Sequence, residues 1–238
     1  MNPLYFQDSY LKEFSSVVTK VNENNSIELE NTAFYPKSGG QEHDTGVLIR
    51  NNEEFPVTYT GKSGEIIFHE LSKTGLQVGD KVVGKINWDR RYKHMRSHTS
   101  AHIISAIIHN KLGALITGNQ ITEEKVRIDF NTENYDPEQL KGFVDQTNKI
   151  IELDLPTKSY FISKEEVEKD PALSKLAKGL PQDLTEFRIV EIGQMDKQVD
   201  GGTHVKSTKE IGTLEFIKAD NRGKNNRRLY YKLIESHN

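Results

Sequence analysis

Residues 1–88 alternate between apolar and polar positions in short runs that are separated by polar turns. The segment FSSVVTKVNENNSIELENT, residues 14–32, predicts two strands around the turn NENNS, and residues 46–71 repeat this pattern around the turns NNEE and GKSG. The segment LQVGDKVVGKINW, residues 76–88, predicts another pair of strands that bends at its Gly-Asp step. Short strands with a turn roughly every 8 to 12 residues predict a small barrel or sandwich. The pattern contains no convincing helix before residue 89.

The spacing of apolar positions becomes helical from residue 89 onward. In DRRYKHMRSHTSAHIISAIIHNKLG, residues 89–113, apolar or small side chains recur close to the period of a helix. Asp89 is expected to cap the start of this helix and Gly113 to end it. A second helix is expected in DPEQLKGFVDQTNKIIELD, residues 136–154, because Pro137 falls in its first turn, where proline fits.

The rest of the chain mixes strands with a short helix. Residues 157–177 predict a strand and then a short helix, and three more strands are expected in EFRIVEIG, IGTLEFIKA and RRLYYKLI, which begin at residues 186, 211 and 227. An all-β start followed by mixed elements predicts an α+β protein with two domains. We expect a small β-barrel domain at residues 1–88 and an α+β domain at residues 89–238, in which a sheet packs on helices.

Composition narrows the class of protein. The 238 residues are 34% hydrophobic, with a mean hydropathy of -0.67, and no apolar run approaches the ~20 residues that span a bilayer. The N-terminus lacks the basic and apolar regions of a secretory signal, so a cytoplasmic protein without a membrane partner is expected. The absence of cysteine excludes disulfides, a thiol nucleophile and thiolate metal ligands.

The net charge of -3 does not indicate nucleic-acid binding, but charge clusters locally in KHMR, residues 93–96, and NRGKNNRR, residues 221–228. Such clusters are more often a solvated face than a binding surface. Charge alone therefore does not lead us to propose RNA binding, and no DNA partner is expected.

Two pairs of polar residues have the spacing of metal ligands. His98 and His102 lie one helical turn apart, which puts their Cβ atoms about 6 Å apart on one face. Asp200 and His204 flank Gly201 and Gly202, and a glycine turn between strands can bring its flanking residues together. Three nitrogens and one oxygen suit Zn2+, and also Fe, Co or Mn. The alternative is that these histidines are simply packed or solvated.

A zinc-peptidase site is excluded by one residue. The HExxH motif needs a glutamate directly after the first histidine as general base. Thr99 occupies that position here. Any water at this metal would need another base or none.

Four segments, in this order along the chain, resemble the alanyl-tRNA editing proteins, which are free-standing relatives of the editing domain of alanyl-tRNA synthetase. They are FYPKSGGQEHDTG at 34–46, INWDRRYKHMRSHTSAHII at 86–104, VRIDF at 126–130 and DGGTHVKSTKEIG at 200–212. The resemblance covers nearly the whole chain and fits the medium-length class. It implies a translation-factor-like N-terminal barrel followed by an editing domain.

The resemblance also implies an activity and a metal centre. Such a protein would hydrolyse the ester of mischarged tRNA(Ala) carrying serine and, in this size class, glycine, without a side-chain nucleophile. The family usually has a cysteine where this chain has Asp200, so the expected Zn2+ would be held by His98, His102, Asp200 and His204, or by the three histidines and an extra water. The metal would either activate a water or anchor the substrate, and the sequence does not choose between these roles.

Further residues are expected to contact the substrate or the tRNA. Substrate contacts are predicted for Ser38, Gly39, Gly40, Gln41, Thr117 and Gln120, although plain turns would explain the same residues. Contacts with tRNA phosphates are predicted for Arg96, Lys206, Lys209, Arg222, Arg227 and Arg228, against the alternative of a solvated face. Two rival functions stay open: a non-catalytic tRNA- or protein-binding module with a structural metal, and a zinc hydrolase of small esters or amides. The oligomeric state and the preference for serine or glycine are also open.

Overall fold

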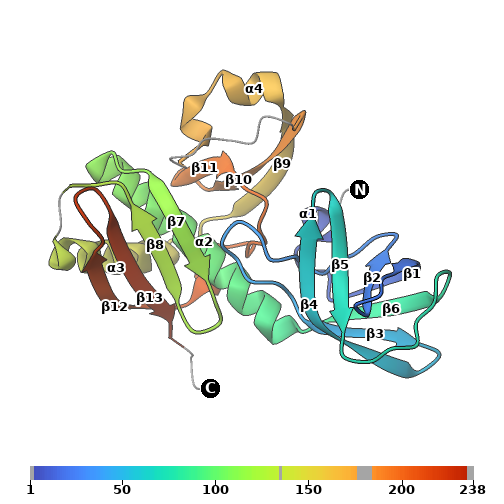
Figure 1. The fold of residues 1–238 in the computed structure, drawn as a ribbon. Helices are drawn as coiled ribbons and strands as arrows, with labels where there is room; N and C mark the ends of the chain where they lie inside the picture. Colours follow the sequence, from blue (N-terminus) through green and yellow to red (C-terminus); the bar gives the residue numbers. More distant parts are fainter. Residues whose placement is uncertain (1–2, 134–135, 176–183, 235–238) are drawn as a thin grey trace. The chain divides into compact units, whose positions relative to one another are not determined.

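The chain folds into two compact units, residues 1–94 and residues 95–238. The computed structural model describes residues 3–133, 136–175 and 184–234 (Figure 1). Helix α2, Trp88–Leu112, begins in the first unit and ends in the second. The predicted domain boundary between residues 88 and 89 stays a prediction.

The first unit is a closed barrel of six antiparallel strands in the order β1-β2-β5-β4-β3-β6 (Figure 1). The strands are β1 Glu13–Val21, β2 Ser26–Leu29, β3 Gly46–Arg50, β4 Glu53–Ser63, β5 Ile66–Leu71 and β6 Lys81–Ile86. Side chains that point into the barrel largely alternate with outward ones along these strands, and Val18, Leu48 and Phe55 are fully buried inside it. The predicted small β-barrel is therefore confirmed.

Three local predictions for this unit are wrong. A one-turn helix, α1 Leu4–Gln7, precedes the barrel. Residues 76–78 form no strand, because the carboxylate of Asp80 accepts a hydrogen bond from the backbone N–H of Gln77 and closes a turn there. Helix α2 starts one residue early, and Asn87 rather than Asp89 caps it by accepting from the N–H of Arg90 at 3.3 Å.

The second unit contains two antiparallel sheets and helices that pack on them. The four-stranded sheet has the order β12-β13-β8-β7, and the three-stranded sheet has the order β11-β10-β9. The strands are β7 Ile116–Ile121, β8 Val126–Phe130, β9 Thr157–Ser163, β10 Glu186–Ile192, β11 Asp196–Val199, β12 Leu214–Asn221 and β13 Arg227–Leu233. The short helices are α4 Lys164–Glu168, η1 Pro171–Leu173 and η2 Thr208–Ile211. This arrangement confirms the predicted α+β fold.

Two long helices cover one face of the four-stranded sheet. Helix α3, Pro137–Ile151, is capped by the side chain of Asp136, and its apolar face packs against β12. Helix α2 is tied to β13 by a 2.9 Å hydrogen bond between the hydroxyls of Ser100 and Tyr231. Gly113 ends α2 in the left-handed conformation, with φ of 66°, as predicted. Among the described residues, no helix is long and apolar enough to cross a membrane.

Candidate metal centre

Helix α2 provides two of the four predicted metal ligands. His98 and His102 lie one turn apart on α2, and both are buried, at 4% and 6% exposure. Their ring centroids are 5.2 Å apart. The helical spacing thus places both imidazoles on the same side of α2. This side is roughly opposite the one on which Ser100 meets β13.

The loop after β11 provides the other two ligands. Arg188 on β10 fixes this loop, because its guanidinium donates to the carbonyl oxygens of Asp200 at 3.1 Å and Gly202 at 3.0 Å. The N–H of Gly202 donates to the carboxylate of Asp200. The loop therefore holds Asp200 in one orientation while the chain continues to His204.

The four side chains converge on one point. The Asp200 carboxylate lies 3.1 Å from His98 Nε2, 3.2 Å from His102 Nε2 and 3.6 Å from His204 Nε2. All four ligand atoms lie within 4.8 Å of one another. Tetrahedral zinc with bonds of 2.0–2.1 Å would hold its ligand atoms about 3.4 Å apart. The observed separations are close to that geometry.

The pKa of each of Asp200, His102 and His204 depends on the other residues of the cluster. Burial disfavours the charged form of Asp200, but the charge of His98 and hydrogen bonds from the imidazoles hold its pKa well below the usual value. Burial also lowers the pKa of His102, but hydrogen bonds to Asp196 and Asp200 outweigh it and raise the pKa to about 9. Burial and the charge of His98 hold the pKa of His204 well below its usual value.

His204 shows how the cluster fits a metal ion. Its Nδ1 lies 3.1 Å from the hydroxyl of Thr99, which itself donates to the carbonyl of Met95 and so accepts the Nδ1–H. The lone pair of Nε2 then points into the cluster, and among the described residues this buried atom has no hydrogen-bond partner. A neutral imidazole with a buried, unused Nε2 lone pair is the form that binds metals. The cluster of His98, His102, Asp200 and His204 could therefore hold a metal ion.

Comparison with known proteins shows the family of this chain. The family model for class II (A) tRNA synthetases matches residues 7–90, and the model for the second additional domain of threonyl- and alanyl-tRNA synthetases matches residues 187–230. The alanyl-tRNA editing protein AlaX-M of Methanosarcina acetivorans is 43% identical over 98% of both chains, and that of Saccharolobus solfataricus is 46% identical over 96% of this chain and 97% of its own. This chain belongs to the alanyl-tRNA editing protein family. The alanine–tRNA ligase of Thermofilum pendens is 36% identical over 90% of this chain but only 24% of its own length.

The glycine-rich motif of this chain forms a tight hairpin within the first unit. Ser38 and Gln41 pair through two backbone hydrogen bonds, and Gly39 and Gly40 between them have φ of 56° and 86°. Positive φ at both central residues is the signature of a type I′ turn, which glycine adopts without strain. The hairpin explains the two glycines structurally. A substrate contact of these four residues stays a prediction.

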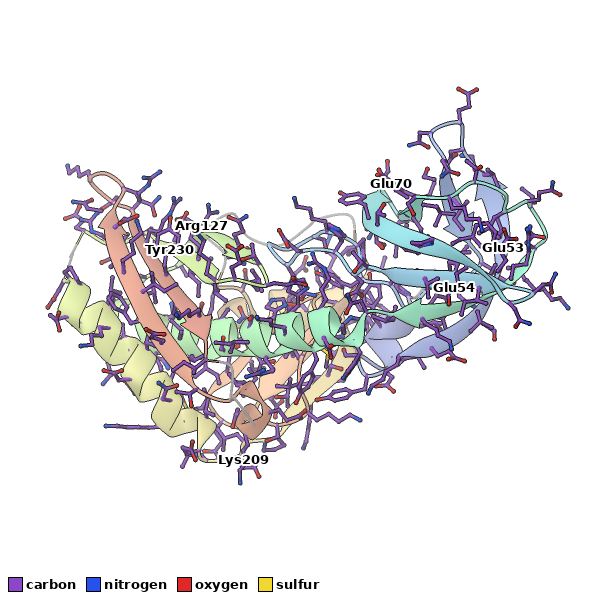
Figure 2. The ribbon with its side chains drawn as sticks, turned by 90° about the horizontal axis from the view of Figure 1, so that it is seen from below. Glu53, Glu54, Glu70, Arg127, Lys209 and Tyr230 are labelled. Atoms are coloured by element: carbon purple, nitrogen blue, oxygen red, sulfur yellow. The ribbon has the colours of Figure 1, made fainter. Side chains whose placement is uncertain are left out.

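Thr117 and Gln120 lie on strand β7 and not at a turn, which corrects the simpler alternative for them. The hydroxyl of Thr117 lies 3.1 Å from Oδ1 of Asn226. Gln120 is paired with Arg127, and Arg127 with Tyr230, on the sheet face opposite the one that meets α2 (Figure 2). The structure does not bring the Gln120 side chain to the four clustered residues.

The predicted tRNA contacts of this chain fall into two groups. Lys206, Lys209 and Arg222 are exposed (Figure 2 labels Lys209). The other three are engaged within the protein: Arg96 donates to the carbonyl of Ile211, Arg228 makes a paired contact with Asp129 at 2.7 and 2.8 Å, and the buried Arg227 donates to carbonyls of its own hairpin.

Sequence reasoning missed the residues that surround the four predicted ligands. Thr99, Lys175, Arg188 and Asp196 all contact the cluster or its supports, yet no motif or spacing marks them. The only available signal was at Thr99, whose position replaces the glutamate of HExxH. The hydroxyl of Thr99 lies 3.1 Å from Nδ1 of His204.

Proposed function

We propose that this protein hydrolyses the ester bond of mischarged tRNA(Ala), releasing serine and also glycine. In this reaction water adds to the ester carbonyl carbon, the bond to the terminal ribose oxygen breaks, and the free amino acid and the tRNA hydroxyl are released. The observation that carries the proposal is the convergence of three imidazole Nε2 atoms on the Asp200 carboxylate. Membership of the alanyl-tRNA editing family supports the choice of substrate.

We further propose that His98, His102, Asp200 and His204 hold one Zn2+ ion. When bound, zinc supplies a Lewis acid that polarises a carbonyl or lowers the pKa of water. The protein contributes the fixed positions of the imidazoles, and the burial of the cluster strengthens every charge interaction within it. An oxygen ligand in place of the family's usual sulfur makes this site harder and widens the choice of metals.

Selectivity follows from the difference between serine and alanine. A synthetase pocket that accepts a methyl side chain rejects a slightly larger or smaller side chain by only about 1–3 kcal/mol. A second site that hydrogen-bonds the serine hydroxyl leaves its own polar groups unpaired when alanine binds, and so spares correctly charged tRNA. Of the predicted substrate contacts, we propose Ser38, Gly39, Gly40, Gln41 and Thr117. Gln120 is left out of the proposal because its side chain lies on the sheet face away from α2.

Binding of tRNA is proposed to use basic side chains on the second unit. Exposed cations attract phosphates without reading sequence, so they would position the tRNA rather than select it. Lys206 precedes the short helix η2 that follows His204, and Lys209 lies within that helix. Both lysines are exposed, which favours them over the buried Arg227. Arg222 is exposed in the loop between β12 and β13, and Arg96 and Arg228 are partly exposed.

The test is the release of amino acid from Ser-tRNA(Ala), Gly-tRNA(Ala) and Ala-tRNA(Ala), measured with and without a chelator and with zinc added back. We expect rapid, metal-dependent loss of serine, loss of glycine as well, and little loss of alanine. His102→Ala should abolish metal binding and deacylation together. His109→Ala, a histidine on the same helix that lies outside the cluster, should preserve both.

One result would redirect the assignment. A zinc-loaded protein that leaves Ser-tRNA(Ala) intact would contradict the hydrolase. Because four protein ligands can close the coordination shell of a structural zinc site, that result would favour a tRNA-binding module.

A further inference from the structure

Asp196 lies directly behind His102. It is the first residue of strand β11, and its Oδ2 is 2.8 Å from Nδ1 of His102, the ring nitrogen that faces away from Asp200. The Asp196 side chain is completely buried. The same imidazole thus has a carboxylate at each end, with Asp200 on the side of the cluster and Asp196 on the opposite side.

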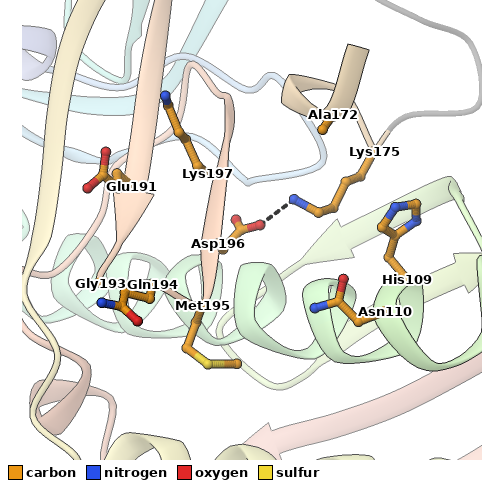
Figure 3. A pocket seen from close by; sticks show the side chains of 10 residues that line it. All are labelled: His109, Asn110, Ala172, Lys175, Glu191, Gly193, Gln194, Met195, Asp196 and Lys197. Atoms are coloured by element: carbon orange, nitrogen blue, oxygen red, sulfur yellow. Dashed lines mark hydrogen bonds and ion pairs between the residues drawn. The ribbon is translucent and has the colours of Figure 1, made fainter. Parts of the chain in front are cut away.

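A lysine compensates the buried charge of Asp196. The ammonium group of Lys175 lies 2.5 Å from Oδ1 of Asp196 (Figure 3). The side-chain amide nitrogen of Gln198 donates to Oδ2 at 2.8 Å and also lies 2.9 Å from Nδ1 of His102. Lys175 is itself only 8% exposed. A buried carboxylate is costly unless it is paired and hydrogen-bonded, and these contacts supply both conditions.

The Lys175–Asp196 pair also borders a pocket. A pocket of about 460 Å³ is lined by Lys175 and Asp196, together with Met195 and Lys197, and none of the four clustered residues lines it (Figure 3). Asp196 therefore contacts His102 and also belongs to the lining of that pocket.

We propose that Asp196 is a positioning residue for the metal centre, which accepts the Nδ1–H of His102 and thereby aims its Nε2 lone pair at the metal, while Lys175 holds Asp196 in place. The inference rests on the metal site of the proposed function. It assigns no contact between Asp196 and substrate. Asp196 acts only through His102.

Asp196 would help metal binding because it selects one of two tautomers and one of many ring orientations of the His102 imidazole. A neutral imidazole carries its proton on either nitrogen, and a fixed acceptor at Nδ1 selects the tautomer whose Nε2 is free to bind metal. Partners of this kind typically contribute about 10–100-fold to metal affinity. A carboxylate also raises the basicity of the ligating nitrogen more than a neutral acceptor does.

The experiment compares zinc dissociation constants, measured by competition with a chromophoric chelator, for the wild-type protein and the variants Asp196→Asn, Asp196→Leu and Lys175→Met. We expect Asp196→Leu to weaken zinc binding about 10–100-fold, and Asp196→Asn, which keeps an acceptor oxygen, to weaken it less. Lys175→Met should weaken it by a smaller factor still. Asp129→Asn, which removes a buried, ion-paired carboxylate from another sheet, is the matched control and should leave zinc affinity unchanged.

A second readout separates positioning from general structural damage. The absorption spectrum of bound Co2+ reports coordination geometry, so Asp196→Asn should alter the spectrum while thermal unfolding of the metal-free protein shows a folded variant. Wild-type zinc affinity and an unchanged cobalt spectrum in both Asp196 variants would overturn the inference. A zinc-loaded wild-type protein without deacylase activity would overturn the proposed function alone, because the affinity comparison does not depend on turnover.

Discussion

Gly202 lies so close to His98 that a Cβ atom on residue 202 would be 2.1 Å from Cε1 of the imidazole. No real side chain occupies such a distance, so the loop after β11 can approach α2 only because residue 202 is glycine. Its backbone is otherwise held firmly, since its carbonyl accepts from Arg188 and its N–H donates to Asp200. The glycine is thus part of the candidate metal centre although it offers no ligand atom.

Gly202→Ala should displace His98 from the cluster. We expect at least a tenfold loss of zinc affinity, measured by chelator competition, because the methyl group and the imidazole cannot occupy the same space. Gly142→Ala, on α3, has no heavy atom within 4 Å of the added Cβ and serves as the control. That control should bind zinc normally and be equally or slightly more stable, since alanine is a better helix former. Unchanged zinc binding by Gly202→Ala would contradict the role of this close approach.

Thr99→Val should weaken the site through His204. Valine has the shape of threonine but cannot accept the Nδ1–H of His204 or the backbone N–H of Val205, which lies 3.2 Å from the Thr99 hydroxyl. We expect about 10–100-fold weaker zinc binding, and a stability loss of about 1–3 kcal/mol from the unsatisfied buried N–H. Both quantities are measured on purified protein, by chelator competition and by urea unfolding. Thr99→Ser keeps the hydroxyl and should restore most of the zinc affinity; equal losses in both variants would argue against the hydrogen bond.

Much of this architecture could be predicted from local patterns. The alternation in residues 14–32 and 46–71 is enough to identify barrel strands, and the one-turn spacing of His98 and His102 follows from helix geometry alone. Strand β7, with the sequence ITGNQI, was missed because its exposed polar residues leave little alternation to detect. Its pairing with β8, and not its own composition, makes it a strand.

The supports of the metal site could not be predicted for a different reason. Asp196 meets His102 across 94 positions of sequence, and Lys175 meets Asp196 across 21. No periodicity or motif connects such residues, because only the packing of β11 against α2 brings them together. The candidate ligands were recognisable because a metal ion would restrict both the type and the spacing of its ligands. A residue that only supports a ligand needs no more than an acceptor atom in the right place.

The glycine-rich motif of the barrel and the start of α2 are joined by a buried ion pair. Asp44 and Arg91 are both 0% exposed, Nε of Arg91 lies 2.9 Å from Oδ2 of Asp44, and Nη1 of Arg91 donates to the carbonyl of Ser9. Arg91→Met should destabilise the first unit by about 3–5 kcal/mol, because it leaves a buried carboxylate without its partner. The fluorescence of Trp88, the only tryptophan, reports this unit during urea unfolding.

The exposed pair of Lys62 and Glu65 provides the control for that ion pair. Lys62→Gln should cost at most about 1 kcal/mol, as solvent-exposed pairs do. The double variant Asp44→Leu with Arg91→Met should cost less than the sum of the two single variants, because it removes both charges together. Additive losses would mean that the two side chains stabilise the barrel independently.

His69 makes the stability of the barrel sensitive to acid. It is fully buried, with Nε2 2.9 Å from the hydroxyl of Thr32, and burial lowers its pKa from about 6.5 to about 4. The unfolded chain therefore takes up a proton as the pH falls below about 6.5, whereas the folded barrel does not until about 4. Since the unfolded state binds more protons in this window, stability is lost as the pH falls through it and is unaffected above it. At pH 5 the loss is about 2 kcal/mol relative to pH 7.5, and it approaches about 3 kcal/mol near pH 4.

The variant His69→Gln isolates this contribution. Glutamine is uncharged at every pH, so the difference in unfolding free energy between the wild type and the variant, followed by Trp88 fluorescence, should change by about 2 kcal/mol between pH 7.5 and pH 5. The carboxylates titrate in both proteins, and their effects cancel in the difference. His109→Gln, at a half-buried histidine in the second unit, should give no such change in the same signal. A wild type and a His69→Gln variant with parallel pH profiles would show that the folded barrel takes up the proton as readily as the unfolded chain.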